Sequence, residues 1–252
     1  MKNLKVASYN VSGGFYIGNE DTEYLDRKAA DTFDDKLLNE LVETVNKEDI
    51  DILCIQEVIT TPSVEYLKKI SEKTNLKYYD AFELSPCNLV KNTEFGVAIM
   101  SKYKINSSKK SIFPNPKISK TTSSGNTYYL HDKGYIICDV EIENKNLTIL
   151  THQGFPFRRF NSTPEQHPQV FEHFNDVIKK FNIDIVTGDF NAENFMQLIP
   201  TLNNDYQRTI NQVTTVDGKN FDDILINKNK KYNSKLIKLL SDHFMLITTI
   251  NE

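Results

Sequence analysis

The chain has 252 residues, of which 39% are hydrophobic and 25% are charged. This composition is that of a globular protein with enough apolar side chains to bury a core, and it excludes low-complexity and collagen-like chains. The formal net charge is −4, which argues against a surface dedicated to coating nucleic acid but allows an enzyme that meets phosphate only beside a bound divalent cation.

Three cysteines, Cys54, Cys87 and Cys138, fit no zinc-binding spacing. Cys54 and Cys138 lie inside apolar runs, so we expect buried free thiols. No apolar run approaches the about 18 residues of a membrane span, and the start, MKNLKVASYN, lacks the apolar stretch of a secretory signal. We therefore expect a cytoplasmic protein with no transmembrane segment.

Apolar runs alternate along the chain with segments of helical spacing. The runs predict strands at 4–10, 51–57, 95–101, 134–142, 146–152, 183–189, 221–227 and 244–250. Helices are predicted at about 31–47, after Thr61-Pro62, and from Ser162 to about Phe181, whereas 228–238 is a Lys-rich segment. Without a linker or repeat, residues 1–252 are expected to form one domain, in which two sheets pack face to face with helices outside.

Polar residues lie at the ends of several of the predicted strands, next to their apolar runs. They are Asn10, Glu57, His152, Asp189 with Asn191, Asp222, and Asp242 with His243. Buried amides and carboxylates are costly unless they are paired or bind a metal. Side chains at the ends of several core strands can converge on one edge of a sheet, so we expect them to form a single site.

The residue types in this set favour one chemistry. Amide and carboxylate oxygens suit Mg²⁺, with Mn²⁺ as the alternative, better than zinc. Histidines and further carboxylates remain for proton transfer. A hard cation beside a histidine–carboxylate pair is typical of enzymes that hydrolyse phosphoric esters.

The order of these motifs resembles the endonuclease/exonuclease/phosphatase superfamily, which has the deoxyribonuclease I-like fold. The motifs are YN (9–10), IQE (55–57), GVAIMS (96–101), TH (151–152), GDFN (188–191), FDDILI (221–226) and SDH (241–243). The resemblance covers residues 4–250. It implies an α/β fold, a four-layer α/β/β/α sandwich of two mostly antiparallel sheets, with the active site at one end of the paired sheets.

The resemblance also implies a metal site. Glu57 resembles the main metal-binding carboxylate of the family, and Asn10 resembles the amide beside the metal and the scissile phosphate. Asp242 resembles the second carboxylate near the metal.

The catalytic roles implied by the resemblance fall on five residues. Asp189 and Asn191 resemble the pair that orients the attacking water and the phosphate. His243 resembles the general base or phosphate-contacting histidine, and Asp222 resembles the carboxylate that orients it. His152 resembles the histidine that stabilises the phosphate or protonates the leaving oxygen.

Strand alternation separates the two adjacent aspartates of FDDILI. Because neighbouring side chains in a strand point to opposite faces, we expect only Asp222 at the site. Asp223 is expected to face solvent or to support the site from behind.

Three basic residues are candidates for contact with the substrate phosphate. Arg158 and Arg159 follow His152 closely, and the planar guanidinium suits phosphate. The alternative is a surface pair or a packing contact. Lys133 is the basic residue of the region before His152.

The sequence therefore predicts a Mg²⁺-dependent hydrolase of phosphoric esters. A nuclease or phosphodiesterase acting on DNA or RNA comes first. A phosphatase or phosphodiesterase of a small or lipid phosphate, similar to sphingomyelinases or inositol-phosphate phosphatases, is the alternative. The third possibility is a non-catalytic protein of the same fold that binds phosphate without turnover. It ranks last because such a protein would be expected to have lost Glu57, Asp189 or His243, and all three are present. No protein partner is indicated.

Overall fold

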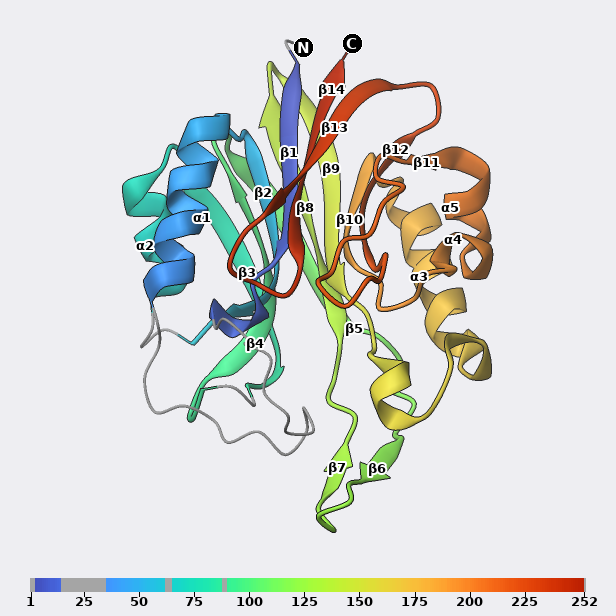
Figure 1. The fold of residues 1–252 in the computed structure, drawn as a ribbon. Helices are drawn as coiled ribbons and strands as arrows, with labels where there is room; N and C mark the ends of the chain where they lie inside the picture. The colour runs from blue at the N-terminus through green and yellow to red at the C-terminus, as the bar shows by residue number, and fades with distance from the viewer. Residues whose placement is uncertain (1–2, 15–34, 62–64, 88–89, 252) are drawn as a thin grey trace.

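The computed structural model describes residues 3–14, 35–61, 65–87 and 90–251, and it contains two six-stranded sheets. The first sheet has the order β13 (Lys231–Lys238), β14 (Phe244–Asn251), β1 (Leu4–Asn10), β2 (Ile52–Ile59), β4 (Glu94–Ser101), β3 (Tyr78–Pro86). The second has the order β11 (Tyr206–Arg208), β12 (Asp222–Asn227), β10 (Ile185–Asp189), β9 (Lys145–Gln153), β8 (Gly134–Ile142), β5 (Ile105–Ile112). A separate hairpin pairs β6 (Ser119–Thr121) with β7 (Thr127–Tyr129) and projects beyond the sandwich (Figure 1).

Helices cover the outer face of each sheet, so the molecule has four layers (Figure 1). The first sheet carries α1 (Asp35–Glu48) and α2 (Tyr66–Lys73), and the second carries α3 (Pro168–Phe181), α4 (Phe195–Leu198) and α5 (Pro200–Asp205). Short 3₁₀ turns lie at η1 (Ser12–Gly14), η3 (Phe157–Phe160) and η4 (Pro164–Gln166). The predicted α/β sandwich is confirmed.

Each sheet is buried on both faces. One apolar cluster lies between the two sheets. Each sheet also packs against its own helices through one further apolar cluster. The strands that are covered on both sides read as continuous apolar runs, which is why the sequence identified them. For the same reason, apolar residues do not reveal which side chains of a strand face inward.

The structure contains all eight predicted strands, with ends that shift by at most two residues. The first predicted helix is described from Asp35 and the second from Tyr66, while residues 31–34 and Pro62 lie outside the described residues. The Lys-rich segment 228–238 contains β13, and the sequence does not predict β3, β5, β6, β7 and β11. β5 and β13 are edge strands with many exposed side chains, which hides them from a search for apolar runs.

Two further expectations can be compared with the structure. Cys54, Cys87 and Cys138 are free and buried. Among the described residues, no helix is long and apolar enough to cross a membrane.

The expectation that Asp223 faces solvent or supports the site is wrong. Asp223 is fully buried on the face of β12 opposite to Asp222, where its Oδ2 accepts a hydrogen bond from Arg208 Nε at 2.6 Å. The backbone N–H groups of Thr209 and Ile210 also donate to its Oδ1. Burial raises the pKa of Asp223 to about 7, although Arg208 acts in the opposite direction. Asp223 therefore anchors β11 and the following loop.

Removing the guanidinium from this pair should destabilise the fold. Arg208→Met leaves the Asp223 carboxylate buried without its cation, so we expect a loss of about 3–5 kcal/mol in the free energy of unfolding. Arg158→Met is the matched control, because the ion pair of Arg158 with Asp217 is solvent-exposed and should contribute at most about 1 kcal/mol. Urea unfolding of both variants gives the comparison, and equal losses would contradict this interpretation.

Candidate active site

The site lies at one rim of the sandwich because the directions of four pairs of strands bring their ends to the same edge. β1 and β2 are parallel, as are β9 and β10, so their carboxyl ends reach the same edge. β12 is antiparallel to β10 and β14 is antiparallel to β1, so the starts of β12 and β14 reach that edge as well. The rim therefore gathers polar residues from segments far apart in the chain, as the sequence predicts.

The Asp189 carboxylate is the most heavily hydrogen-bonded group at this rim. Its Oδ2 accepts N–H groups from Asn10 (3.1 Å), Gln153 (2.9 Å) and Asn191 (2.9 Å). Its Oδ1 accepts the backbone N–H of Asn191 at 2.8 Å. Since Asn10 belongs to the first sheet and Gln153 to the second, Asp189 links the two sheets at the site.

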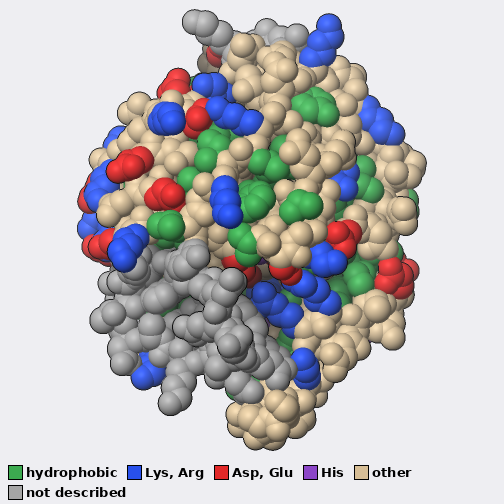
Figure 2. All heavy atoms as spheres, in the orientation of Figure 1, with side chains coloured by type: hydrophobic (Ala, Val, Ile, Leu, Met, Phe, Trp, Pro, Cys, Tyr) green, Lys and Arg blue, Asp and Glu red, His purple; other side chains and the backbone are tan. Residues whose placement is uncertain are grey.

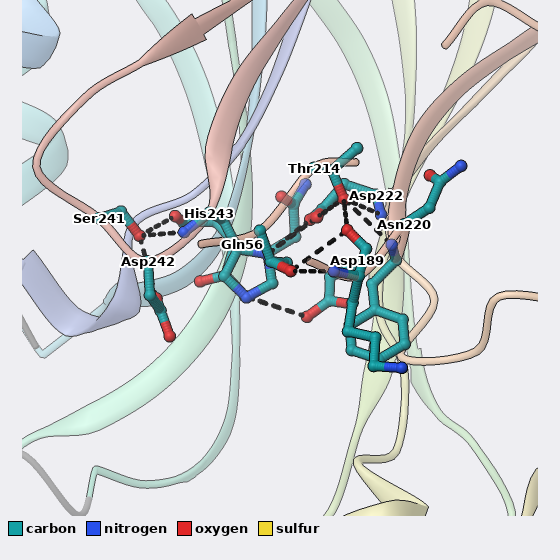
Figure 3. Close-up of polar contacts among 12 residues, drawn as sticks. Gln56, Asp189, Thr214, Asn220, Asp222, Ser241, Asp242 and His243 are labelled. Carbon is teal, nitrogen blue, oxygen red and sulfur yellow. Dashed lines mark hydrogen bonds and ion pairs between the residues drawn. The ribbon is translucent and has the colours of Figure 1, made fainter. Parts of the chain in front are cut away.

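His243 and Asp222 form a buried pair next to Asp189 (Figure 3). His243 Nδ1 lies 2.8 Å from Asp222 Oδ2 and 3.0 Å from Oδ1. Thr214, which the sequence analysis missed, donates its hydroxyl to Asp222 Oδ2 at 2.8 Å and accepts the backbone N–H of Asp222. The carboxylate is therefore held from both sides and fixes the orientation of the imidazole.

The other ring nitrogen of His243 faces Asp189. His243 Nε2 lies 4.0 Å from Asp189 Oδ2, which is too far for a hydrogen bond. A water molecule or phosphoryl oxygen between the two could contact both groups.

The two facing groups have pKa values shifted upward. Burial alone would lower the pKa of His243, but the neighbouring Asp222 carboxylate outweighs burial and raises it well above its usual value. Burial raises the pKa of Asp189 to about 7, and the charge of Asp222 adds to the shift. Near neutral pH, the imidazole is therefore suited to donate and Asp189 is poised to exchange a proton.

Glu57 reaches the site through a β-bulge. The pairing of β2 with β4 shifts between Gln56 and Val58, and Glu57 adopts a left-handed φ of 51°. Bulges commonly turn a side chain toward an active site. The half-buried Glu57 carboxylate accepts a hydrogen bond from Gln153 Nε2 at 3.2 Å, which places it beside Asp189.

The residues at the rim fit a hard divalent cation. Glu57 accepts only that one hydrogen bond from the described residues, so its carboxylate can ligate an ion. Ligand atoms of Asp189, Asp222 and His243 also lie within 4.8 Å of one another. Asp189 and Asp222, however, already accept several N–H and O–H donors, whereas Glu57 and the Oδ1 of Asn10 each accept one, so Glu57 with Asn10 is the more available set.

Asp242 lies next to Ser241 and apart from Asp189 and Asp222 (Figure 3). Its Oδ1 accepts a hydrogen bond from Ser241 Oγ at 3.3 Å, and its charge acts on the imidazole of His243. Asn191, whose φ is 51°, also donates from Nδ2 to the carbonyl oxygen of Gly154.

The expectation that His152 stands at the site is wrong. Its side chain points to the opposite face of β9, into the aromatic core, where the ring lies 4.6 Å from Phe174 and 4.3 Å from Phe190. Neither ring nitrogen has a hydrogen-bond partner among the described residues. The ring also lies over Gly188, where a Cβ would come within 2.7 Å of it and where φ is +148°, so only glycine fits at this position.

Gln153 stands at the site in place of His152. It is the last residue of β9 and is buried on the inner face, next to Asp189 in the register of β9 and β10. The alternation of β9 turns it inward, because Ile149 contributes to the cluster between the sheets and Leu150 to the outer one. Since both of these residues are apolar, the sequence alone carries no signal that Gln153 rather than His152 faces the site.

The three basic candidates lie at different depths. Lys133 is buried, and its ammonium is close enough to Glu57 and Asp189 for their charges to act on it, while burial lowers its pKa. Arg158 is exposed and pairs with Asp217 at 2.8 Å. Arg159 is half-buried, and its charge acts on Lys133. Figure 2 shows Lys and Arg side chains gathered with acidic ones just below the centre of this face.

The burial of His152 predicts acid-sensitive stability. Burial lowers the pKa of His152 to about 3, so the folded state excludes a proton that the unfolded chain binds below about pH 6.5. The stabilising contribution is present above that pH and is lost progressively as the pH falls toward 3. Between pH 7 and pH 5 the loss amounts to about 2 kcal/mol.

His152→Leu removes this titration. We expect its free energy of unfolding to fall less than that of the wild type between the two pH values, and any enzymatic activity at neutral pH to be retained. Urea unfolding at both pH values measures the first effect. An unchanged pH dependence of stability would contradict the buried, neutral imidazole.

Comparisons with known proteins agree with this architecture. A search of the curated proteins found no match. Among solved structures, the human Nocturnin catalytic domain with bound sulfate has a TM-score of 0.64 at 17% identity, with 99% of this chain and 93% of that chain covered. D. rerio TDP2 complexed with single strand DNA product has a TM-score of 0.63 at 18% identity, with 99% of both chains covered. Bacteroides thetaiotaomicron mannosyl-6-phosphatase Bt3783 has a TM-score of 0.63 at 15% identity, with 99% of this chain and 100% of that chain covered.

These likenesses show the fold. Residues 7–243 match the sequence model of the Endonuclease/Exonuclease/phosphatase family. With the match extending from β1 to His243, the chain belongs to that family.

Proposed function

We propose that this protein is a divalent-cation-dependent hydrolase of phosphoric esters, with Mg²⁺ as the expected ion. The observation that carries the proposal is the pair of facing groups at the rim: the His243 imidazole, held by Asp222, points its free nitrogen at the Asp189 carboxylate. A phosphate ester and its attacking water need a proton donor and a proton acceptor within reach of one another. The two groups meet that need.

The roles of the two groups follow from their surroundings. Asp189, held by four N–H donors, orients the attacking water and accepts its proton. His243, with its pKa raised by Asp222, donates a hydrogen bond to the phosphoryl oxygen. Asn191 supports the phosphate from the loop after β10. His152 has no part in this scheme.

Glu57 and Asn10 are the residues that would hold the cation. When bound, the cation would neutralise charge on the phosphoryl oxygens. Glu57 supplies a carboxylate directed to the site by the bulge, and Asn10 anchors Asp189 through Nδ2 while its Oδ1 accepts the N–H of Ser12. We propose that Asp242, whose charge acts on the imidazole of His243, adds a further carboxylate near the cation.

Lys133 supplies positive charge for the substrate. The Lys133 side chain is buried, burial lowers the pKa of its ammonium, and the charges of Glu57 and Asp189 act on it; a buried cation normally acquires a counter-ion. A phosphoryl group bound near Glu57 and Asp189 would provide one. Arg158, which already pairs with Asp217, is the weaker candidate for this contact.

For substrate class, we propose a phosphodiester in DNA or RNA first. D. rerio TDP2, crystallised with a single strand DNA product, shares the fold over nearly the whole chain. A small phosphate ester is the second candidate, because basic and acidic side chains are mixed on the face in Figure 2 and the formal charge is −4. Assays with Mg²⁺ on plasmid DNA, RNA, sphingomyelin, sugar phosphates and inositol phosphates separate the two classes.

Glu57→Gln and His243→Ala should each abolish most of the activity on the best substrate. We expect losses of about 10²–10⁴-fold in kcat, because each removes a group that acts on the reacting phosphate or its cation. EDTA should inactivate the wild type, and added Mg²⁺ should restore its activity.

Asp242→Asn tests whether this carboxylate contributes to the cation site. Full activity of Glu57→Gln or His243→Ala would contradict the site assignment.

Lys133→Met should weaken binding of the phosphate group. We expect a rise in KM and in the inhibition constant of inorganic phosphate of about 10-fold or more, since a charge-assisted contact is lost. Lys145→Met is the matched control, because Lys145 is exposed at the opposite end of β9. Steady-state kinetics with phosphate as inhibitor give both constants. Equal inhibition of the wild type and Lys133→Met would exclude the proposed contact.

A further inference from the structure

The Gln153 carboxamide joins two carboxylates that come from different sheets. Its Nε2 donates to Asp189 Oδ2 at 2.9 Å and to Glu57 Oε1 at 3.2 Å. The orientation of the amide is fixed by these contacts, because the flipped orientation would place its oxygen against two acceptors. Both amide protons are therefore used to hold Glu57 and Asp189 in one arrangement.

The stability of the fold does not explain why a glutamine is buried at position 153. The side chain is 1% exposed, and its Oε1 has no hydrogen-bond partner among the described residues. A buried carbonyl oxygen without a donor costs about 1–3 kcal/mol. An apolar residue between the sheets would avoid that cost, so the amide is better explained by the two carboxylates it holds.

We propose that Gln153 is a positioning residue that aligns the cation carboxylate Glu57 with the water-orienting carboxylate Asp189. This inference rests on the proposed function. The bulge brings Glu57 to the rim, and its carboxylate accepts no other hydrogen bond from the described residues, so Gln153 is the contact that fixes the orientation of the carboxylate there. Groups that orient a metal ligand typically change metal affinity or activity by about 10- to 100-fold when removed.

Gln153→Met keeps the volume of the side chain and removes both hydrogen bonds. We expect the affinity for Mn²⁺, measured by electron paramagnetic resonance of the free ion, to fall by about 10- to 100-fold. At saturating Mn²⁺, kcat on bis(p-nitrophenyl) phosphate should still be reduced because Asp189 loses a donor, whereas KM should change little. Unchanged Mn²⁺ affinity in a folded Gln153→Met protein would overturn the inference.

Gln56→Met is the matched control. Gln56 is also a buried amide between the sheets, but its Nε2 donates to Ser8 and Thr151 rather than to a carboxylate. We expect it to lower thermal stability while leaving Mn²⁺ affinity unchanged. A loss of affinity as large as in Gln153→Met would show that any buried amide produces the effect, and would overturn the assignment.

Gln153→Glu provides a second variant of the same shape. The variant adds a carboxylate that can ligate the ion, so we expect Mn²⁺ binding to be kept. We expect kcat to fall, because Asp189 loses the N–H donor of Gln153 and faces a second negative charge instead. Wild-type kcat in Gln153→Glu would contradict the positioning role.

Measurements of Mn²⁺ binding and of hydrolysis, on the wild type and on Gln153→Met, separate the role of Gln153 from the proposed function. Hydrolysis with normal Mn²⁺ binding in Gln153→Met would overturn only the role of Gln153. Mn²⁺ binding that depends on Gln153 without hydrolysis of any ester would support the positioning role and overturn the proposed function. A wild type that binds no Mn²⁺ would overturn both.

Discussion

The hydrogen bonds to the Asp189 carboxylate are the constraint on which the rest of the site depends. A buried carboxylate is unfavourable unless donors surround it, and here the donors come from β1, from β9 and from the loop after β10. Asn10 can reach Asp189 only if the two sheets keep their spacing at this rim. The geometry of the site therefore depends on how the two sheets pack against each other.

Two kinds of backbone feature then direct side chains to this point. Strand alternation sends Gln153 and Asp222 inward while it sends His152 and Asp223 outward, so adjacent residues have unrelated roles. The bulge at Glu57 breaks the alternation of β2 and turns a carboxylate back to the rim. Residues with a positive φ, such as Glu57, are found more often at functional sites, where the surrounding structure holds the strained backbone in place.

Much of the fold and part of the site could be predicted from the sequence. Strands buried on both faces give long apolar runs, and polar residues at their ends, such as Asp189 and His243, stand out against them. The edge strands β5 and β13 could not be predicted in this way, because their exposed side chains lack an apolar pattern. The sequence favours His152 over Gln153 only through its residue type, because both faces of β9 are apolar and the inward face cannot be read from the sequence.

In the proposed site, side chains from both sheets hold one hard cation through Glu57 beside the Asp189–His243 pair. A crystal structure with Mn²⁺, using the anomalous signal of the ion, measures this most directly. We expect the ion within ligand distance of the Glu57 carboxylate, on the Asn10 side of the rim. A peak bonded to Asp222 and His243, with Glu57 uninvolved, would contradict this expectation.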